Sequence, residues 1–265
     1  MKRSFKDQLN RDIEVNFPPK RIISLVPSQT ELLFDLGLDT EVIGLTKFCI
    51  HPIKKFAERT KIGGTKKLNI DQIRSLEPDL IIGNKEENEQ AQIEELMTEF
   101  PVWMSDIYTL ADAKQTITQI GELVDRQPEA SYLNFLINAG FTDLQALALQ
   151  QGIDKRVAYL IWREPYMLAG KDTFIDDILT INGLRNVITQ SRYPEIDLSK
   201  LNELKPDFIF LSSEPYPFKE KHTEEIKKAV PGAKVMLVDG EMFSWYGSRL
   251  VKAVQYLFQL QKELV

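Results

Sequence analysis

The sequence predicts an α/β protein made of two doubly wound, Rossmann-like lobes with central, mostly parallel sheets. Three observations lead to this prediction. Short apolar runs alternate with amphipathic helical segments, as in βαβ units. The same order of segments occurs twice along the 265 residues. A single long helical segment separates the two halves, so we expect a ligand cleft between lobes that are joined by one helix.

The central segment, Pro128 to Gln151, carries the pattern of one continuous helix. Pro128 suits the first helical turn, and Gly152 is placed to end the helix. About 24 residues at 1.5 Å each give a helix of about 36 Å. Gly140 marks the one place where we expect a bend. The predicted parts are a lobe over 1–127, a connecting helix over 128–152 and a lobe over 153–265, with small lobe motion because helices hinge poorly.

The first half contains the elements of one βαβ lobe, preceded by a short hairpin within Phe5–Val15. Ser28 with Glu31 three residues later predicts a capping box for a helix that ends at Gly37. Asn69 or Asp71 caps a helix that ends before Pro78. The remaining elements are expected strands at 21–26, 41–45, 79–83 and 102–104, expected helices at 89–100 and 109–124, and a loop-rich stretch at 48–64.

The second half repeats this order. Residues 198–210 align without a gap with residues 70–82, and both segments read as a helix, a Pro-Asp pair and a buried strand. Asp172 or Thr173 caps a helix that ends at Asn182-Gly183. The other expected elements are strands at 156–161 and 234–238 and helices at 223–229 and 248–263.

Composition excludes several classes of protein. A net charge of −6 argues against a nucleic-acid binder. No apolar run approaches the roughly 18 residues that a membrane helix needs. The first 15 residues have basic side chains but no apolar core, so we expect no signal peptide; the protein is then cytoplasmic, or its leader has been removed. One cysteine and two histidines predict no disulfide and no His-based metal site.

Side chains that follow the predicted strands are the candidate ligand contacts, because ligands bind at the carboxyl ends of parallel strands. Aromatic residues on these loops suit a large, flat ligand. A second interpretation stays open, in which Trp162 and Trp245 pack the interface between lobes. The candidates are Ser28, Phe48, Asn84, Lys85, Glu86, Trp162, Tyr166, Tyr193, Glu214, Met242, Phe243, Trp245, Tyr246 and Arg249.

The sequence shows no catalytic motif, so we expect no enzyme and no catalytic residues. It lacks the G-x-S-x-G, G-x-x-x-x-G-K and G-x-G-x-x-G patterns. Cys49 and His51 form a C-x-H pair, which reads as a thiolate with its base, as two metal ligands or, more often, as a coincidence. Ser28 is either a nucleophile or a plain N-cap, and the N-cap is favoured. Glu86 and Glu214 belong either to a carboxylate cluster or to solvated loops.

The chain resembles the helical-backbone class (class III) of ABC-transporter substrate-binding proteins, which includes the cobalamin-, siderophore- and haem-binding receptors. The resemblance spans nearly the whole chain and is closest to the cobalamin-binding receptors. It rests on RIISLVPSQTELLFDLG at 21–37, VIGLTKF at 42–48, IGGTKKLNIDQIRSLEPDLIIGNKEEN at 62–88, GKDTFIDDILTINGLRNV at 170–187 and LNELKPDFIFLSSEP at 201–215.

The resemblance implies a periplasmic or envelope-bound monomer that delivers a corrinoid, haem or ferric chelate to an ABC permease, with no cofactor of its own. It implies aromatic or apolar ligand contacts at Phe48, Tyr166, Tyr193, Met242 and Phe243, and a basic contact at Arg249. Permease docking is implied at Asp71; the second docking glutamate is replaced by Ser199, with Glu195 nearby. Thr65 and Asn84 stand where aromatic residues are expected, which leaves room for a more polar ligand. The alternative is an intracellular corrinoid- or chelate-handling protein, or an enzyme, on the same scaffold.

Overall fold

A computed structural model describes residues 1–264 and divides the chain into two compact units. Unit 1 comprises 1–107, 111–136 and 246–249, and unit 2 comprises 108–110, 137–245 and 250–265. The expected connecting helix is therefore shared between the units. A short segment near the C-terminus, Tyr246–Arg249, belongs to the N-terminal unit.

Unit 1 is built on a five-stranded, all-parallel sheet with strand order β5-β4-β3-β6-β7. Its strands are β3 (Ile22–Ser24), β4 (Val42–Leu45), β5 (Thr60–Lys61), β6 (Leu80–Asn84) and β7 (Val102–Ser105). Its helices are α1 (Pro27–Asp35), α2 (Ile53–Glu58), α3 (Ile70–Ser75), α4 (Gln90–Met97) and most of α5 (Leu110–Leu123). The expected N-terminal hairpin is confirmed as β1 (Lys2–Lys6) paired with β2 (Asp12–Asn16).

Two local predictions for this unit were wrong. The capping box does not form, because α1 begins at Pro27 with Val26 as its N-cap and no side chain caps it. The N-cap Val26 has no side-chain acceptor, Ser28 lies inside the first turn of α1, and the Glu31 carboxylate pairs with Arg249 instead. The loop-rich stretch at 48–64 contains α2 and β5, which are too short for a periodic pattern to reveal. The Asn69 cap of α3 is confirmed by its bond from the Gln72 N–H, 3.1 Å long.

Unit 2 has a four-stranded parallel path with order β10-β8-β11-β12, and β9 pairs antiparallel with β8. Its strands are β8 (Lys155–Trp162), β9 (Met167–Leu168), β10 (Leu184–Asn186), β11 (Phe208–Ser212) and β12 (Lys234–Val238). Its helices are α7 (Phe174–Ile181), α8 (Leu198–Glu203), α9 (Glu220–Ala229), α10 (Glu241–Ser244) and α11 (Leu250–Leu264). Thr173 caps α7 with its hydroxyl, so the alternative cap at Asp172 is not used.

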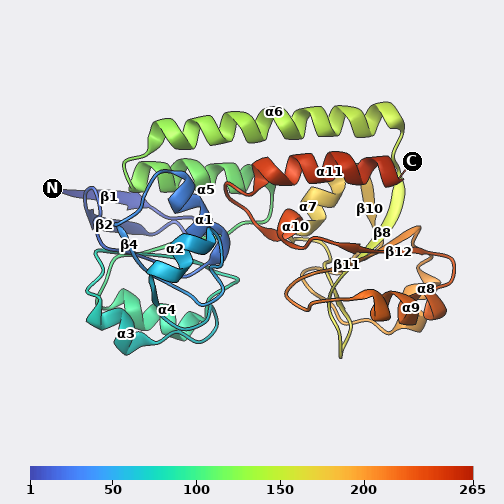
Figure 1. Ribbon diagram of the computed structural model, residues 1–265, viewed down its shortest axis with the longest axis horizontal. Helices are drawn as coiled ribbons and strands as arrows, with labels where there is room; N and C mark the ends of the chain where they lie inside the picture. The colour runs from blue at the N-terminus through green and yellow to red at the C-terminus, as the bar shows by residue number, and fades with distance from the viewer. Residues whose placement is uncertain (265) are drawn as a thin grey trace. The chain divides into compact units, whose positions relative to one another are not determined.

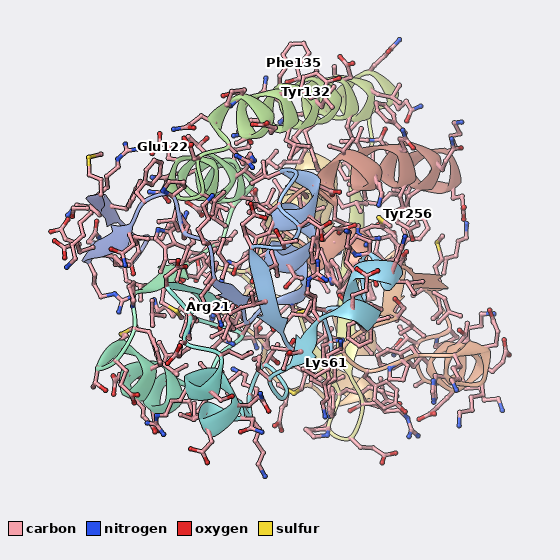
Figure 2. All side chains as sticks on the ribbon, turned by 60° about the vertical axis from the view of Figure 1, so that its left-hand side comes forward. Arg21, Lys61, Glu122, Tyr132, Phe135 and Tyr256 are labelled. Atoms are coloured by element: carbon pink, nitrogen blue, oxygen red, sulfur yellow. The ribbon has the colours of Figure 1, made fainter. Side chains whose placement is uncertain are left out.

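The internal duplication is confirmed, because α8 and β11 match α3 and β6 residue for residue in the predicted alignment. The repeated Pro-Asp pair has the same structural task in both units. Asp79 accepts a 2.8 Å bond from the Arg21 N–H, and Asp207 accepts a 2.7 Å bond from the Arg156 N–H. Both arginine side chains also bind carbonyls at the end of the preceding helix; Figure 2 marks Arg21 beside the sheet of unit 1. The Pro-Asp pair thus holds each helix against the start of its neighbouring strand.

The predicted long helix is confirmed as α6 (Gln127–Gln151), which Figure 1 shows as unbroken. In unit 1, α6 lies so close to α5 that a Cβ placed on Gly121 would stand 2.4 Å from Ala130. In unit 2, α6 lies close to α11, and a Cβ on Gly140 would stand 2.8 Å from the methyl carbons of Val254. Gly140 is therefore explained by close helix packing within unit 2. Within residues 1–264 no helix is long and apolar enough to cross a membrane.

Candidate functional site

The carboxyl edge of the sheet in unit 1 presents one exposed aromatic ring, Phe48. The strand order reverses between β3 and β6, which is where doubly wound sheets bind ligands. Phe48 follows β4, is 51% exposed and has the Lys47 ammonium 5.0 Å from its ring centroid. A Cβ on Gly64 would come within 3.1 Å of this ring, so the glycine leaves space for it. Phe48 is thus available to an approaching ligand.

Most polar candidates of unit 1 form hydrogen bonds or ion pairs within the protein. Asn84 is buried; its amide donates to the Ser105 hydroxyl, and its carbonyl oxygen accepts the backbone N–H of Glu86 at 2.9 Å. Ser28 is buried in the first turn of α1. Lys85 donates to Asp106 at 2.6 Å and stays half exposed. Of this group, the side chain of Lys85 is the most open to solvent, while Asn84 shapes the loop after β6.

Cys49 is closed to both of the chemical roles considered for it. The thiol has no exposed surface, and it lies 3.1 Å from the hydroxyls of both Thr30 and Thr46. Burial raises its pKa, so the reactive thiolate is disfavoured. Within residues 1–264 no group of three or more His, Cys, Asp or Glu side chains is arranged to hold a metal ion. Burial therefore keeps the Cys49 thiol away from solvent and in its protonated form.

Arg249 forms a buried ion pair that sequence reasoning did not foresee. Its Nε and Nη2 each donate to a carboxylate oxygen of Glu31 at 2.8 Å. The two side chains are 6% and 4% exposed. A Cβ on Gly247 would stand 2.9 Å from the Ser28 carbonyl oxygen, so glycine lets this segment lie against α1. Arg249, expected to touch a ligand, has its bidentate face occupied by Glu31 within unit 1.

The carboxyl edge of unit 2 presents a larger aromatic surface. Here the strand order reverses between β8 and β11. Trp162 ends β8, is 40% exposed and meets Tyr216 edge to face with centroids 5.8 Å apart. Tyr216 in turn packs on Phe218, and Phe218 packs edge to face on His222. The packed rings of Tyr216, Phe218 and His222 therefore support Trp162, and the rest of its indole surface is exposed to solvent.

Beside Trp162, the turn between β8 and β9 carries a polar cluster centred on Glu225. The Tyr166 hydroxyl donates to Glu225 at 2.6 Å, and the Arg163 guanidinium donates to the same carboxylate at 3.1 Å. These bonds, the Tyr166 one first, lower the pKa of Glu225. Burial and the hydrogen bond to Glu225 raise the pKa of Tyr166 to about 12. The cluster fixes Tyr166, a predicted ligand contact, as a neutral phenol.

Glu214 is a partly buried acidic residue just after β11. One of its oxygens accepts bonds from the Ser244 hydroxyl and the Trp245 indole N–H, each 2.8 Å long. Burial raises the pKa of Glu214 despite these two donors. A Cβ on Gly240 would stand 2.6 Å from the Glu214 Cγ, so this approach requires glycine. The Glu214 carboxylate therefore anchors Trp245 and Ser244 within unit 2.

Phe243 has the placement of a core residue. It has no exposed surface and packs against Tyr159, Phe210 and Tyr256 at centroid distances between 5.1 and 6.2 Å. Trp245 and Tyr246 are also buried. Ligand contact at these three positions would require packed side chains to move. Sequence position alone did not distinguish these rings from Trp162, because all lie on loops after strands.

The remaining candidates lie at or near the surface. Met242 and Tyr193 are partly buried, and the Arg192 guanidinium lies 5.9 Å from the Tyr193 ring centroid. Asp71, in the first turn of α3, has a side chain that is 96% exposed. Ser199 is the second residue of α8, the matching place in unit 2, and is exposed, as is Glu195. Glu31, Tyr216 and Glu225 were not among the predicted contacts, although Tyr216 follows β11 as the other candidates follow their strands.

Comparison with known proteins decides the family. The model of the periplasmic binding protein family matches residues 22–236. The chain belongs to this family. The ABC transporter substrate-binding lipoprotein YvrC of Bacillus subtilis (strain 168) is 25% identical over 266 residues, covering 95% of this chain and 82% of YvrC. The vitamin B12-binding protein of Pectobacterium carotovorum subsp. carotovorum (strain PC1) is 24% identical over 251 residues, covering 90% of this chain and 87% of that protein.

The fold of this periplasmic binding protein also matches a solved structure. The periplasmic vitamin B12-binding protein BtuF of Vibrio cholerae superimposes with a TM-score of 0.80 at 20% identity, covering 94% of this chain and 99% of BtuF. The predicted α/β class, and the resemblance to ABC-transporter substrate-binding proteins, are thereby confirmed.

Proposed function

We propose that this protein is the substrate-binding component of an ABC importer and that its ligand is a corrinoid of the vitamin B12 type. Membership of the periplasmic binding protein family supports the transport role. The observation that carries the choice of ligand is the similarity, over 251 residues, to a vitamin B12-binding protein. The protein then works by binding and release, without catalysing a reaction, and acts at the cell envelope, as the relative named as a lipoprotein suggests.

Each unit, considered by itself, offers an aromatic surface that suits such a ligand. A corrin is a flat macrocycle with apolar faces and peripheral amides, so it suits aromatic side chains with a few hydrogen-bonding groups nearby. Unit 1 supplies Phe48 at its carboxyl edge, and unit 2 supplies Trp162 with Tyr166. We assign Phe48 and Trp162 the largest contributions, because both rings are already exposed and need no rearrangement.

A ferric or haem chelate is the second ligand class, favoured by one observation. Thr65 and Asn84 stand where the resemblance to cobalamin receptors leads us to expect aromatic rings, and the Asn84 amide is engaged with Ser105. Unit 1 therefore offers little stacking area beyond Phe48. Titrations with cyanocobalamin, haem and a panel of ferric siderophores distinguish the two ligand classes, with quenching of the protein's tryptophan fluorescence as the readout. No affinity tighter than about 10 µM for any of them would refute the proposed function.

Permease docking is assigned to Asp71 on α3, with a weaker contribution from the α8 side. Asp71 is the single carboxylate of α3 and its side chain is 96% exposed, whereas Ser199 supplies no charge at the matching position. Glu195 is the exposed acidic residue near Ser199. Stimulation of the cognate transporter's ATPase by the loaded protein tests this assignment, which fails if Asp71→Lys leaves stimulation unchanged.

A further inference from the structure

Residues 47–67 of unit 1 combine positive charge with exposed apolar side chains. This segment contains seven lysine and arginine residues and one acidic residue, although the net charge of the whole chain is −6. Three large apolar side chains of the segment are exposed: Phe48 at 51%, Ile50 at 43% and Ile53 at 75%. Exposed apolar side chains that are scattered singly need no explanation, but a cluster of them marks a contact surface.

The turn after β4 leaves two of these side chains at the surface because the residue between them is held inside. Cys49 has no exposed surface, and its thiol lies 3.1 Å from the hydroxyls of both Thr30 and Thr46. Phe48 and Ile50, on either side of Cys49 in the sequence, are both exposed. The exposure of Ile50 is therefore a consequence of how the turn is anchored.

Helix α2 presents a second part of the same surface. Lys55 and Arg59 both form ion pairs with Asp39, so their side of α2 faces the protein. At 100° per residue, Ile53 lies on the opposite side of the helix, and both Ile53 and Lys54 are exposed. The outer side of α2 thus offers an aliphatic side chain next to an ammonium group.

A turn at 64–67 adds further lysines beside this segment. A Cβ on Gly64 would stand 3.1 Å from the Phe48 ring, so the turn lies directly against the residues that follow β4. The Gly64 N–H donates to the Lys67 carbonyl at 2.9 Å, and both Lys66 and Lys67 are exposed. Phe48 itself is assigned to the ligand. We call the other five exposed residues the lysine–isoleucine surface: Ile50, Ile53, Lys54, Lys66 and Lys67.

The residue types of the lysine–isoleucine surface fit an anionic lipid bilayer better than a protein partner. Lysine is depleted in protein–protein interfaces, where arginine and aromatic residues are enriched. At a bilayer, aliphatic side chains enter the boundary between headgroups and acyl chains, while lysines keep their ammonium groups near the lipid phosphates. The acidic remainder of the chain does not prevent this attraction, because charges more than about 10 Å away are largely screened at 0.1 M salt.

We propose that the lysine–isoleucine surface binds unit 1 to a bilayer that contains anionic phospholipids. This interaction is distinct from ligand binding, and it holds the carboxyl edge of the unit 1 sheet close to the membrane in which an importer lies. Lysines near an anionic surface each strengthen binding, and this surface has three of them with two isoleucines. A surface of this size binds reversibly, so the protein is able to leave the membrane between deliveries.

Co-sedimentation of the ligand-free full chain with lipid vesicles tests the proposal. Vesicles of phosphatidylcholine mixed with phosphatidylglycerol should bind the protein, and vesicles of phosphatidylcholine alone should bind it at least about tenfold more weakly. Raising the salt from about 0.1 M to about 1 M shortens the screening length from about 10 Å to about 3 Å, so binding to the mixed vesicles should fall steeply.

Two pairs of variants assign the binding to this surface. Lys54→Glu combined with Lys67→Glu should weaken binding to the mixed vesicles by about tenfold or more. Lys221→Glu combined with Lys228→Glu on α9 is the matched control, because both control lysines are exposed and the net charge changes by the same amount. Ile53→Glu should also weaken binding, whereas Leu149→Glu on α6, at a side chain that is 77% exposed, should not.

Several results would overturn the proposal. They are the absence of binding to the mixed vesicles at low salt, equal binding to both kinds of vesicle, and equal weakening by the two double-lysine variants. Loss of binding to the detergent-solubilised transporter in the Lys54 and Lys67 double variant, with vesicle binding unchanged, would assign the surface to a protein partner instead. Vesicle binding is measured without ligand, so a chain that binds vesicles but no chelate would refute the proposed function and leave this proposal standing.

Discussion

The buried pair of Arg249 and Glu31 leads to the sharpest prediction about stability. Arg249→Met removes the guanidinium and leaves the Glu31 carboxylate, at 4% side-chain exposure, without the two 2.8 Å bonds that balance its charge. Breaking a buried pair from one side costs about 3–5 kcal/mol. A domain is stable by about 5–15 kcal/mol, so this loss is a large part of the total.

The double variant separates charge from packing. Glu31→Leu combined with Arg249→Met replaces the pair by apolar side chains, and such replacements are often neutral or stabilising. We therefore expect the double variant to recover most of the stability lost in Arg249→Met. Arg74→Met is the matched control, since Arg74 on α3 pairs with Glu99 at the surface and such pairs contribute about 0–1 kcal/mol.

Urea unfolding gives the free energy of unfolding of the wild type, the two single variants and the double variant, and thermal melting gives their Tm values. At about 2–4 °C per kcal/mol for a chain of this size, Arg249→Met should lower Tm by roughly 10 °C. A loss below about 1 kcal/mol in Arg249→Met, or a double variant no more stable than Arg249→Met, would refute the idea that this pair anchors the 246–249 segment. Ligand binding by the double variant also decides whether Arg249 contacts the ligand: a structural anchor predicts that binding is retained.

Four further outcomes are expected. Burial raises the pKa of Glu214, so the ionised carboxylate destabilises the folded state above that pKa, and this cost disappears as the pH falls below the ordinary value of 4.5. Glu214→Gln should therefore be more stable than wild type near pH 8 and no more stable near pH 4. Urea unfolding at the two pH values measures the difference. Trp162→Ala should weaken corrinoid binding about tenfold or more, measured by calorimetry at a temperature where the variant is folded. Gly140→Ala should cost about 1–3 kcal/mol through its clash with Val254, and Val254→Ala in the same chain should relieve that clash. Asp71→Lys should reduce ATPase stimulation while ligand affinity stays unchanged, and reduced affinity would argue against a docking role.

Much of the fold could be predicted because the spacing of apolar residues along the chain indicates helices and strands. The C-terminal end of α6 was predicted to the residue, and its start was one residue off. The duplicated segments were recognisable because their Pro-Asp pairs recur at matching places, and each aspartate holds the start of a neighbouring strand. Elements such as β5, β9 and α10 were missed, since two to four residues cannot show a period.

The candidate site was less predictable, because its partners are distant in sequence. Glu31 and Arg249 are 218 positions apart, and nothing local links them, so Glu31 was interpreted as part of a capping box. Phe243 and Trp162 look alike as aromatic residues after strands. The structure places Phe243 in the core and leaves Trp162 at the surface. Exposure depends on packing between elements, which a pattern along the chain does not encode.

Direct calorimetric titration of the purified protein with cyanocobalamin tests the central claim most directly. The account predicts one ligand per chain, a Kd tighter than about 10 µM and a loss of affinity in Trp162→Ala. Binding to the wild-type protein that is absent or weaker than this, together with the same result for haem and ferric siderophores, would contradict it.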